Sequence, residues 1–249
     1  MQFDENNIIG TGAQADVFLY ENHIYKLYRK GYEKAAIFYE AAVTSLVQSN
    51  ENIRMAGVHE VLQIEDTYAL RMDYIPGDTL QQLYEADKQS AARHINTLVT
   101  LQCQIQKKSV DLPLTLKHQL HDKILKSSQL DPLQKNKLIK MLEQLPDGNG
   151  LCHGDFHWGN IIINDNQLYV IDWIDATVGC VNADACKTYM LFLLHENNLA
   201  ALYLTMYCAQ SGQSKTDVLQ WLPVLVGARF SDDIHEEEET LHTWLEDLI

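Results

Sequence analysis

The chain has 249 residues, 46% of them hydrophobic, which is enough apolar material to bury a core in one large domain or two lobes. Its 34 acidic and 19 basic residues give a formal net charge of -15, which repels a phosphate backbone, so nucleic acid is not an expected partner. Five cysteines without a C-x-x-C pair predict neither a disulfide framework nor a zinc ribbon. With no leader pattern and no long apolar run, we expect a cytoplasmic protein with no membrane partner.

The first part of the chain, up to residue 73, predicts a small antiparallel sheet with one helix. Short apolar runs separated by glycine or polar turn residues predict its strands, at residues 8–10, 16–20, 23–28, 58–64 and 67–72. Apolar side chains at helical spacing predict a helix over residues 32–48. The Pro-Gly pair in residues 74–78 breaks the pattern, so we expect a hinge there between an N-terminal lobe, residues 1–73, and a C-terminal lobe, residues 79–249.

Helices dominate the rest of the chain. Helical periodicity predicts them at residues 80–86, 89–107, 114–127, 132–145, 184–195, 199–210, 216–229 and 235–248. A single strand pair, residues 161–163 and 168–171, interrupts this half, with a polar turn between its strands. The predicted fold class is therefore α+β, with a small antiparallel sheet and one helix followed by a mainly helical lobe.

The densest chemical signal is the segment 153–160, His-Gly-Asp-Phe-His-Trp-Gly-Asn, followed by Asp172 at the end of an apolar strand. Phosphoryl transfer needs charge neutralisation on the phosphates, in-line positioning and an acceptor for the hydroxyl proton. Asp155 is the predicted catalytic base. Asn160 and Asp172 supply the hard oxygen ligands that Mg²⁺ prefers alongside phosphates and water. This spacing predicts a Mg²⁺-dependent phosphotransferase.

The N-terminal part contains residues suited to holding a nucleoside triphosphate. Gly10 and Gly12 lie in a loop between two predicted strands, where the backbone can approach phosphates closely. Lys26 follows on the next strand and Glu40 on the helix, in the order required for a phosphate-bridging lysine oriented by a carboxylate. The loop opens into a strand and lacks Gly-Lys-Ser/Thr, so it is neither a dinucleotide fingerprint nor a P-loop. The predicted co-substrate is ATP or GTP.

Two alternatives remain open from the residues alone. His153, Asp155 and His157 alternate beside Cys152, a set that could hold zinc in a hydrolase, although no second His/Cys cluster follows at ligand spacing. The second alternative is a nucleotide-binding pseudoenzyme or regulatory scaffold.

An acidic run at residues 232–239 admits two interpretations. It either lines a cleft for a cationic acceptor or forms a solvated helix face whose charges complement the helix dipole. The solvated face is the interpretation we favour.

In combination, these features resemble the aminoglycoside phosphotransferase and choline kinase-like superfamily. The resemblance runs in order across most of the chain. It is carried by Gly10, Gly12, Lys26, Glu40, the segment 72–77, the loop 153–160 and the strand end 171–173. It implies a bilobal protein-kinase-like fold that transfers the γ-phosphoryl group of ATP or GTP to a hydroxyl group of a small molecule. Aminoglycosides and other amine-bearing compounds are the acceptors it suggests.

The resemblance also implies a role for each site residue. Asp155 would be catalytic, Asn160 and Asp172 would bind the metal, and Lys26 would bind phosphates from a position set by Glu40. The backbone that would hydrogen-bond the purine belongs to Asp73, Tyr74 and Ile75.

Three further positions bear on the resemblance. Asp184 looks like the family aspartate that braces the catalytic loop, and a plain helix N-cap explains it equally well. The third glycine of the phosphate loop is replaced by Ala15, and Asp172 is followed by Trp-Ile rather than Phe-Gly. The absence of Phe-Gly and of an Ala-Pro-Glu segment argues against a protein kinase.

Overall fold

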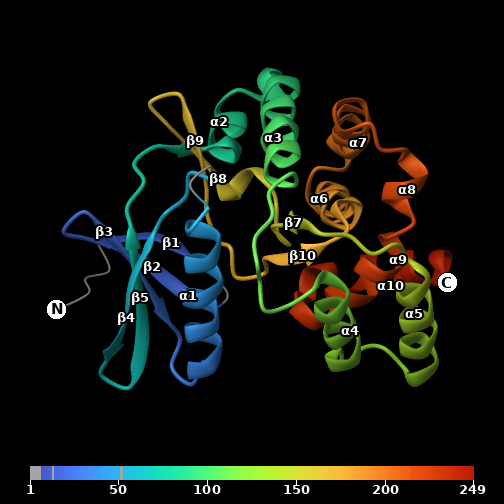
Figure 1. Cartoon of the computed structure of the whole chain (residues 1–249), viewed down its shortest axis with the longest axis horizontal. Helices are drawn as coiled ribbons and strands as arrows, with labels where there is room; N and C mark the ends of the chain where they lie inside the picture. Colours follow the sequence, from blue (N-terminus) through green and yellow to red (C-terminus); the bar gives the residue numbers. More distant parts are fainter. Residues whose placement is uncertain (1–6, 13, 51–52) are drawn as a thin grey trace. The chain divides into compact units, whose positions relative to one another are not determined.

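The computed structural model describes residues 7–12, 14–50 and 53–249, which form two compact units (Figure 1). The first unit comprises Met1–Gln82 and Gly159–Ile174, and the second comprises Leu83–Trp158 and Asp175–Ile249. The first unit therefore includes a later segment of the chain, whereas the hinge at residues 74–78 stays a prediction.

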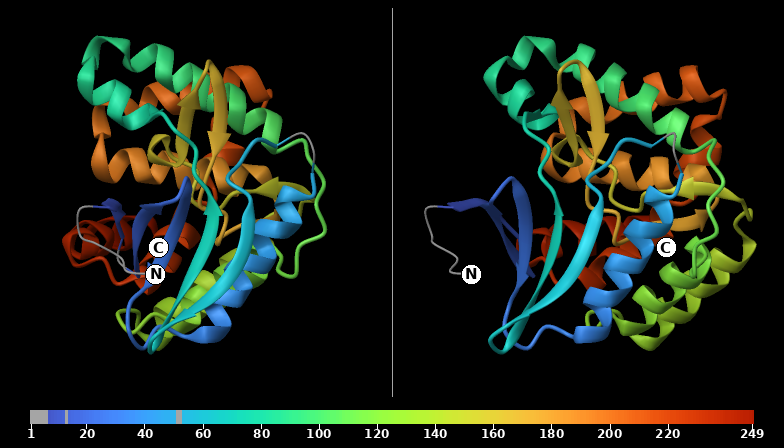
Figure 2. Two further views of the ribbon diagram at one scale, coloured as in Figure 1. Left: turned by 90° about the vertical axis from the view of Figure 1, so that its left-hand side faces the viewer. Right: turned by 60° about the vertical axis from the view of Figure 1, so that its left-hand side comes forward.

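The first unit contains a five-stranded antiparallel sheet with strand order β1-β2-β3-β5-β4. Its strands are β1 (Ile8–Thr11), β2 (Ala15–Tyr20), β3 (His23–Tyr28), β4 (Val58–Ile64) and β5 (Thr67–Asp73). Helix α1 (Lys34–Gln48) lies along one face of this sheet, as both views of Figure 2 show. Tyr28, Ile37 and Leu70 are buried together between helix and sheet. The predicted antiparallel sheet with one helix is confirmed.

A smaller sheet completes the first unit, with strand order β6-β8-β9. Its strands are β6 (Asp78–Thr79), β8 (Ile161–Asn164) and β9 (Gln167–Val170). Asp165 and Asn166 connect β8 to β9 with φ values of 48° and 61°, the positive angles that a two-residue hairpin turn requires. The predicted strand pair is confirmed, and the two-residue β6 is too short to leave a pattern in the sequence.

The second unit is mainly helical. Its helices are η2 (Lys88–Ser90), α3 (Ala91–Ile105), α4 (Leu116–Lys126), α5 (Pro132–Gln144), α6 (Val181–His195), α7 (Asn197–Ser211), α8 (Lys215–Leu219), α9 (Leu222–Arg229), η4 (Phe230–Asp232), η5 (His235–Glu237) and α10 (Glu238–Leu248). Helix α7 packs on α3 and α6, while α9 packs on α4, α5, α6 and α10. Helix α2 (Leu80–Ala86) and the short η3 (Trp158–Asn160) each cross from one unit to the other along the chain. Every helix in the described ranges is too short or too polar to cross a lipid bilayer.

Two predictions about the helical half are wrong. The single helix expected at residues 216–229 is divided into α8 and α9, because Pro223, which lies in the first turn of α9, has no N–H to donate to the carbonyl of Leu219 and its ring would clash with that carbonyl in a continuous helix. A second strand pair, β7 (Gly150–Cys152) with β10 (Thr177–Gly179), was not expected. Each of these strands has three residues, too few to show alternation, and each contains a glycine, so neither forms a continuous apolar run like residues 161–163.

The backbone at Gly77, just before β6, lies against strand β8 of the small sheet. Its φ is +135°, and a Cβ atom there would lie 2.1 Å from the carbonyl oxygen of Ile163. We expect Gly77→Ala to lower the free energy of unfolding by about 3 kcal/mol. The cost of placing alanine at a positive φ adds to the cost of moving the backbone away from the Ile163 carbonyl. Gly31→Ala is the matched control, since Gly31 also has a positive φ but nothing lies within 4 Å. Denaturant unfolding of both variants checks this, and equal losses would contradict the steric explanation.

Candidate active site

The predicted pair of Lys26 on a strand and Glu40 on the helix is in contact. Strand β3 places Lys26 between Val17 of β2 and Leu70 of β5, and its Nζ lies 2.7 Å from Oε1 of Glu40 on α1. The same Nζ lies 3.2 Å from Oδ1 of Asp172. Burial alone lowers the pKa of Lys26, but the carboxylates of Asp172 and Glu40 outweigh burial and raise the pKa above its ordinary value. The ammonium group therefore stays charged between two carboxylates.

The two predicted metal ligands, Asn160 and Asp172, lie at the same end of the β8–β9 hairpin. Ile161 pairs with Val170, so Asn160 just before β8 and Asp172 just after β9 lie at the open end of the hairpin. The N–H of Ile171 donates to the backbone carbonyl of Asn160 at 3.0 Å, which closes this end. Asp172 has a left-handed φ of 63°, an unusual conformation for a non-glycine residue that strand geometry alone does not produce.

A cavity of about 410 Å³ lies in the first unit, a volume within the range of roughly 300–1,000 Å³ typical of small-molecule sites. The predicted site residues in its wall are Gly10, Lys26, Glu40, Asp73, Tyr74, Ile75 and Asp172. Its apolar wall includes Ile24, Ala56, Met72, Ile162, Ile171 and Trp173. The cavity thus combines apolar surface with a few charged groups, whereas Gly12 and Asn160 are not among its lining residues.

Both backbone polar groups of Gly12 are hydrogen-bonded within the first unit. The N–H of Gly12 donates to the carbonyl of Ala15 at 2.9 Å, and Nη2 of Arg29 donates to the carbonyl of Gly12 at 2.9 Å. Ala13 lies outside the described residues. The backbone N–H of Gly12 is therefore bonded to Ala15, and of the two predicted glycines Gly10 alone is part of the cavity wall.

Asp73 makes several contacts within the sheet. Its backbone N–H donates to the carbonyl of Gly57 at 2.9 Å, and its Oδ2 accepts the N–H of Gly57 at 2.9 Å. Nε2 of His59 lies 2.7 Å from its Oδ1. Because the N–H of Asp73 is bonded to Gly57, it is not available for the hydrogen bond to a purine that the sequence predicted for it.

Asp155 belongs to the second unit, in the loop that follows β7. Its backbone N–H donates to Nδ1 of His153 at 3.2 Å, and its Oδ2 lies 3.4 Å from Nε2 of His157. Thr188 on α6 donates to the carbonyl of Phe156 at 2.7 Å. His153 is fully buried, so its ring supports the loop from inside.

Asp184 braces this loop. Its Oδ1 accepts the N–H of Gly154 at 2.8 Å, while its Oδ2 accepts side-chain amide hydrogens from Gln102 at 3.2 Å and Gln106 at 3.1 Å. The alternative that Asp184 is a helix N-cap is wrong, because α6 begins at Val181 and Asp184 lies inside its first turn. These donors satisfy the side chain of Asp184, which is 2% exposed.

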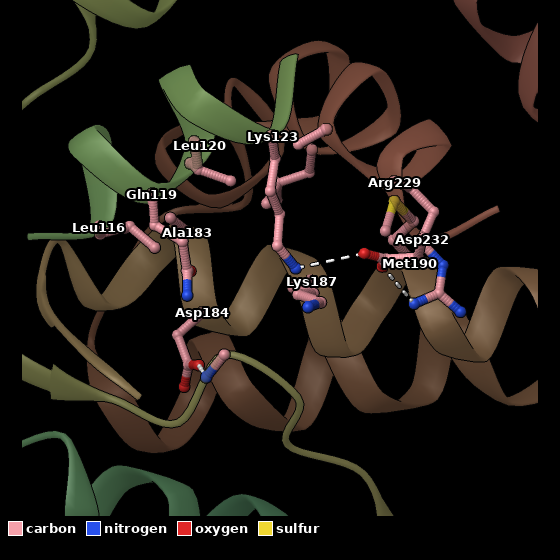
Figure 3. A pocket seen from close by; sticks show the side chains of 13 residues that line it. Leu116, Gln119, Leu120, Lys123, Ala183, Asp184, Lys187, Met190, Arg229 and Asp232 are labelled. Carbon is pink, nitrogen blue, oxygen red and sulfur yellow. Dashed lines mark hydrogen bonds and ion pairs between the residues drawn. The ribbon is translucent and has the colours of Figure 1, made fainter. Parts of the chain in front are cut away.

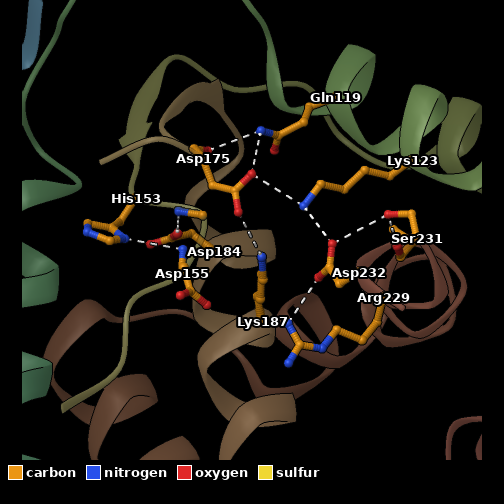
Figure 4. Close-up of polar contacts among 12 residues, drawn as sticks. Gln119, Lys123, His153, Asp155, Asp175, Asp184, Lys187, Arg229, Ser231 and Asp232 are labelled. Carbon is orange, nitrogen blue, oxygen red and sulfur yellow. Dashed lines mark hydrogen bonds and ion pairs between the residues drawn. The ribbon is translucent and has the colours of Figure 1, made fainter. Parts of the chain in front are cut away.

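A chain of alternating charges lies beside Asp155 in the second unit (Figure 4). Asp175 lies 3.8 Å from Nζ of Lys187 and 3.3 Å from Nζ of Lys123. Lys123 also lies 3.3 Å from Asp232, which in turn lies 3.0 Å from Nη1 of Arg229. Burial alone lowers the pKa of Lys123, but the carboxylates of Asp175 and Asp232 raise it to about 12.

The predicted site residues do not include Lys187, Asp175 or Lys123. One signal for Lys187 was available, because it follows Asp184 by three residues on one helix and so shares its face. Lys123 and Asp175 carry no such signal, since they meet only when α4 packs near the start of β10.

Two members of the acidic run, Asp232 and Glu237, belong to this charge chain. A small cavity of about 20 Å³ is lined by α4, α6, α9, η4 and Gly154, and Asp232 is part of its wall (Figure 3). Glu237 is only 5% exposed and accepts two hydrogen bonds from Arg229, at 2.7 Å and 2.8 Å. The favoured interpretation of a wholly solvated face is wrong for Asp232 and Glu237, although Glu236 and Glu239 are exposed. Lys123 and Arg229 form ion pairs with Asp232, and Arg229 also pairs with Glu237, so the two acidic side chains that face inward are compensated.

The zinc alternative finds no support in this geometry. Nδ1 of His153 is occupied by the N–H of Asp155. Within the described ranges, no group of three or more His, Cys, Asp or Glu side chains could hold a metal ion.

The charge of Lys187 bears on the ionisation of Asp155. Burial acts to raise the pKa of Asp155, but the hydrogen bond with His157 and the charges of Lys187, His157 and His153 hold it well below its usual range. We expect Lys187→Met to raise this pKa toward the ordinary value and Lys187→Arg, which keeps the charge, to change it less. Carboxyl NMR titration measures the pKa directly.

The same substitution has a consequence for stability. A carboxyl group with a depressed folded pKa stabilises the protein above its unfolded pKa of about 3.9 and loses that contribution as the pH falls. The stability difference between wild type and Lys187→Met is therefore expected in full at neutral pH and should shrink below about pH 4. A pKa of Asp155 that is unchanged in Lys187→Met would show that the lysine charge does not act on this carboxylate.

Comparison with known proteins identifies the family. The sequence model described as the phosphotransferase enzyme family, APH, matches residues 8–222. No curated protein matches the chain in sequence.

Solved structures share the fold at low sequence identity. A thermostable mutant of aminoglycoside phosphotransferase APH(4)-Ia, in a ternary complex with ADP and hygromycin B, is 11% identical with a TM-score of 0.69 over 97% of this chain and 90% of that one. The streptomycin-ATP-APH(2'')-IIa ternary complex is 16% identical with a TM-score of 0.58 over 98% and 92%. Choline kinase LicA from Streptococcus pneumoniae is 16% identical with a TM-score of 0.61 over 94% and 85%.

The fold of these structures confirms the predicted protein-kinase-like class, and the family match confirms the resemblance read from the motifs. Because that match extends from the first strand past the glycine loop, Lys26, Asp155 and Asp184, the chain belongs to the phosphotransferase enzyme family and is a phosphotransferase with an alcohol group as acceptor.

Proposed function

We propose that this protein transfers the γ-phosphoryl group of ATP or GTP to a hydroxyl group of a small molecule. The observation that carries the proposal is Lys26, held 2.7 Å from Glu40 and 3.2 Å from Asp172 in the wall of a cavity of about 410 Å³. The solved relatives described as complexes with ADP and with ATP support a nucleotide as the co-substrate.

The cavity suggests how a nucleotide would bind. Apolar side chains such as Met72 and Ile171 offer surface for a purine, and the backbone of Tyr74 and Ile75 offers hydrogen-bonding groups. The ammonium group of Lys26 would bind phosphate oxygens, as a compact cation with three donors is suited to do.

Mg²⁺ fits the donor set at the open end of the hairpin. Asp172 supplies a carboxylate and Asn160 an amide oxygen, and such hard oxygens are the ligands that Mg²⁺ prefers. When bound, the ion would neutralise charge on the phosphates. The side chain of Asp172 is 40% exposed, so it is accessible for this role.

Asp155 would orient the attacking hydroxyl and accept its proton. The low pKa of Asp155 makes its carboxylate a weak base, so it holds the hydroxyl by a hydrogen bond and takes the proton as the new O–P bond forms. Asp184 and His153 hold the loop that carries it.

The acceptor is a small molecule, and we propose more specifically that it carries an amine. Its support comes from relatives described as aminoglycoside phosphotransferases and a choline kinase. It does not come from the acidic run, because Asp232 and Glu237 are neutralised by Arg229 and Lys123.

The base assignment is tested with a panel of acceptors. Nucleoside diphosphate release above the no-acceptor rate is measured for aminoglycosides, choline, ethanolamine, amino alcohols and sugars, each with ATP and GTP. Asp155→Asn is expected to reduce the rate with the best acceptor by about 10²–10⁴-fold while nucleotide binding persists. Asp111→Asn, an exposed aspartate, is the control. Full activity of Asp155→Asn refutes the assignment, and Mg²⁺-dependent nucleotide binding without turnover across the panel favours the pseudoenzyme.

The metal assignment is tested by nucleotide binding alone. We expect Mg²⁺ to strengthen ADP or GDP binding by the wild type, and we expect Asp172→Asn to remove most of that dependence because one charged ligand is lost. Calorimetric titration with and without Mg²⁺ measures the effect. Asp165→Asn, in the turn at the other end of the same hairpin, should keep the wild-type dependence; if Asp172→Asn also keeps it, Asp172 is not a ligand.

A further inference from the structure

Each oxygen of the Glu40 carboxylate has its own donor. Nζ of Lys26 lies 2.7 Å from Oε1, and the phenol Oη of Tyr28 lies 2.6 Å from Oε2. Glu40 is 2% exposed and Tyr28 is 1% exposed, so water does not compete for either oxygen. Hydrogen bonds to a buried charged group are the strong ones, and losing one leaves an oxygen without a donor.

The direction of the Tyr28 bond follows from its chemistry. Burial and the Glu40 carboxylate raise the pKa of Tyr28 well above its ordinary value, so the phenol keeps its proton. A carboxylate only accepts, and therefore Tyr28 donates.

Lys26 is shared unequally between its two carboxylates. Its Nζ lies 2.7 Å from Glu40 and 3.2 Å from Asp172, whose side chain is far more exposed. The orientation of the Glu40 carboxylate decides where the ammonium group lies. With Tyr28 bonded to Oε2, the other oxygen points at Lys26. Without that bond the carboxylate is free to rotate, and the lysine moves toward Asp172, the proposed metal ligand.

The same end of β3 also holds the glycine loop. The ring of Tyr28 stacks on Tyr32, with centroids 5.1 Å apart and an interplanar angle of 15°. The hydroxyl of Tyr32 donates to the side chain of Gln14 at 2.8 Å, and the N–H of Arg29 donates to the carbonyl of Gln14 at 2.8 Å. A continuous set of contacts thus runs from the loop through two tyrosines to Glu40 and Lys26.

We propose that Tyr28 is a positioning residue of the nucleotide site, whose hydroxyl orients Glu40 and thereby sets Lys26 for phosphate binding. The proposal rests on the proposed role of Lys26. Tyr28 is also a core residue beside Ile37 and Leu70. A purely structural tyrosine would affect stability, whereas a positioning tyrosine affects the phosphate part of the ligand selectively.

Calorimetric binding of a nucleotide and its nucleoside separates these roles. ADP and GDP are titrated against adenosine and guanosine for wild type, Tyr28→Phe and Tyr68→Phe. Tyr68 packs against the same core outside the Glu40 network, which makes it a matched control for loss of a phenol hydroxyl. We expect Tyr28→Phe to weaken diphosphate binding about tenfold, as loss of one charge-assisted hydrogen bond implies, with nucleoside binding unchanged. Tyr68→Phe should behave as wild type toward both ligands.

A double-mutant cycle tests whether Tyr28 acts through Glu40. In a Glu40→Gln background, Tyr28→Phe should have little additional effect on diphosphate affinity. If Tyr28→Phe folds poorly alone, Glu40→Gln is compared with the double variant. Glu40→Gln removes the buried carboxylate charge that needs the Tyr28 hydroxyl, so Tyr28→Phe is better tolerated in that background.

Several results would overturn the proposal. Equal losses for diphosphate and nucleoside would make Tyr28 a structural residue, and unchanged diphosphate binding would show that its hydroxyl does not set Lys26. Additive effects in the cycle would contradict action through Glu40. Failure of the wild type to bind any of the four ligands would instead refute the proposed function, and this inference with it.

Discussion

The buried carboxylate of Glu40 is the constraint on which the first unit depends. A charge that is 2% exposed is tolerated only if partners replace the lost water, and here Lys26 and Tyr28 do so from one strand. These partners tie α1 to β3, while the second contact of Lys26 ties β3 to Asp172, two residues after β9. The ammonium group of Lys26, which we propose binds phosphates, is therefore placed by the same interactions that stabilise the Glu40 charge in the interior.

The second unit uses a related arrangement around Asp184. This carboxylate has neutral donors, the backbone N–H of Gly154 and the amides of Gln102 and Gln106. Hydroxyl groups of Tyr203 and Tyr207 in turn donate to those two amides at 2.6 Å and 2.8 Å. A fully bonded polar network of this kind has one low-energy arrangement, so it holds a loop more rigidly than apolar packing would. This network fixes Gly154 and thereby the position of the neighbouring Asp155.

Sequence patterns predicted the elements that are long and periodic, and missed those that are short. The five strands of the first sheet and helices such as α5 follow from apolar runs between turn residues and from helical spacing. The three-residue pair β7 and β10 has no such pattern. The division at residues 220–221 depends on a proline, whose effect on a preceding helix varies with the packing of neighbours such as the buried Trp221.

The sequence by itself determined the kind of chemistry, because Asp155, Asn160, Asp172, Lys26 and Glu40 stand in an order and spacing that few other functions require. It also indicated that Asp184 braces a loop, without excluding an N-cap. Only the tertiary structure decided which charges meet: Lys187 with Asp175, Arg229 with Glu237, and Tyr28 with Glu40. The physical reason is that the energy of a charge depends on burial and on partners a few ångströms away, and both are set by how distant segments pack rather than by residue spacing along the chain.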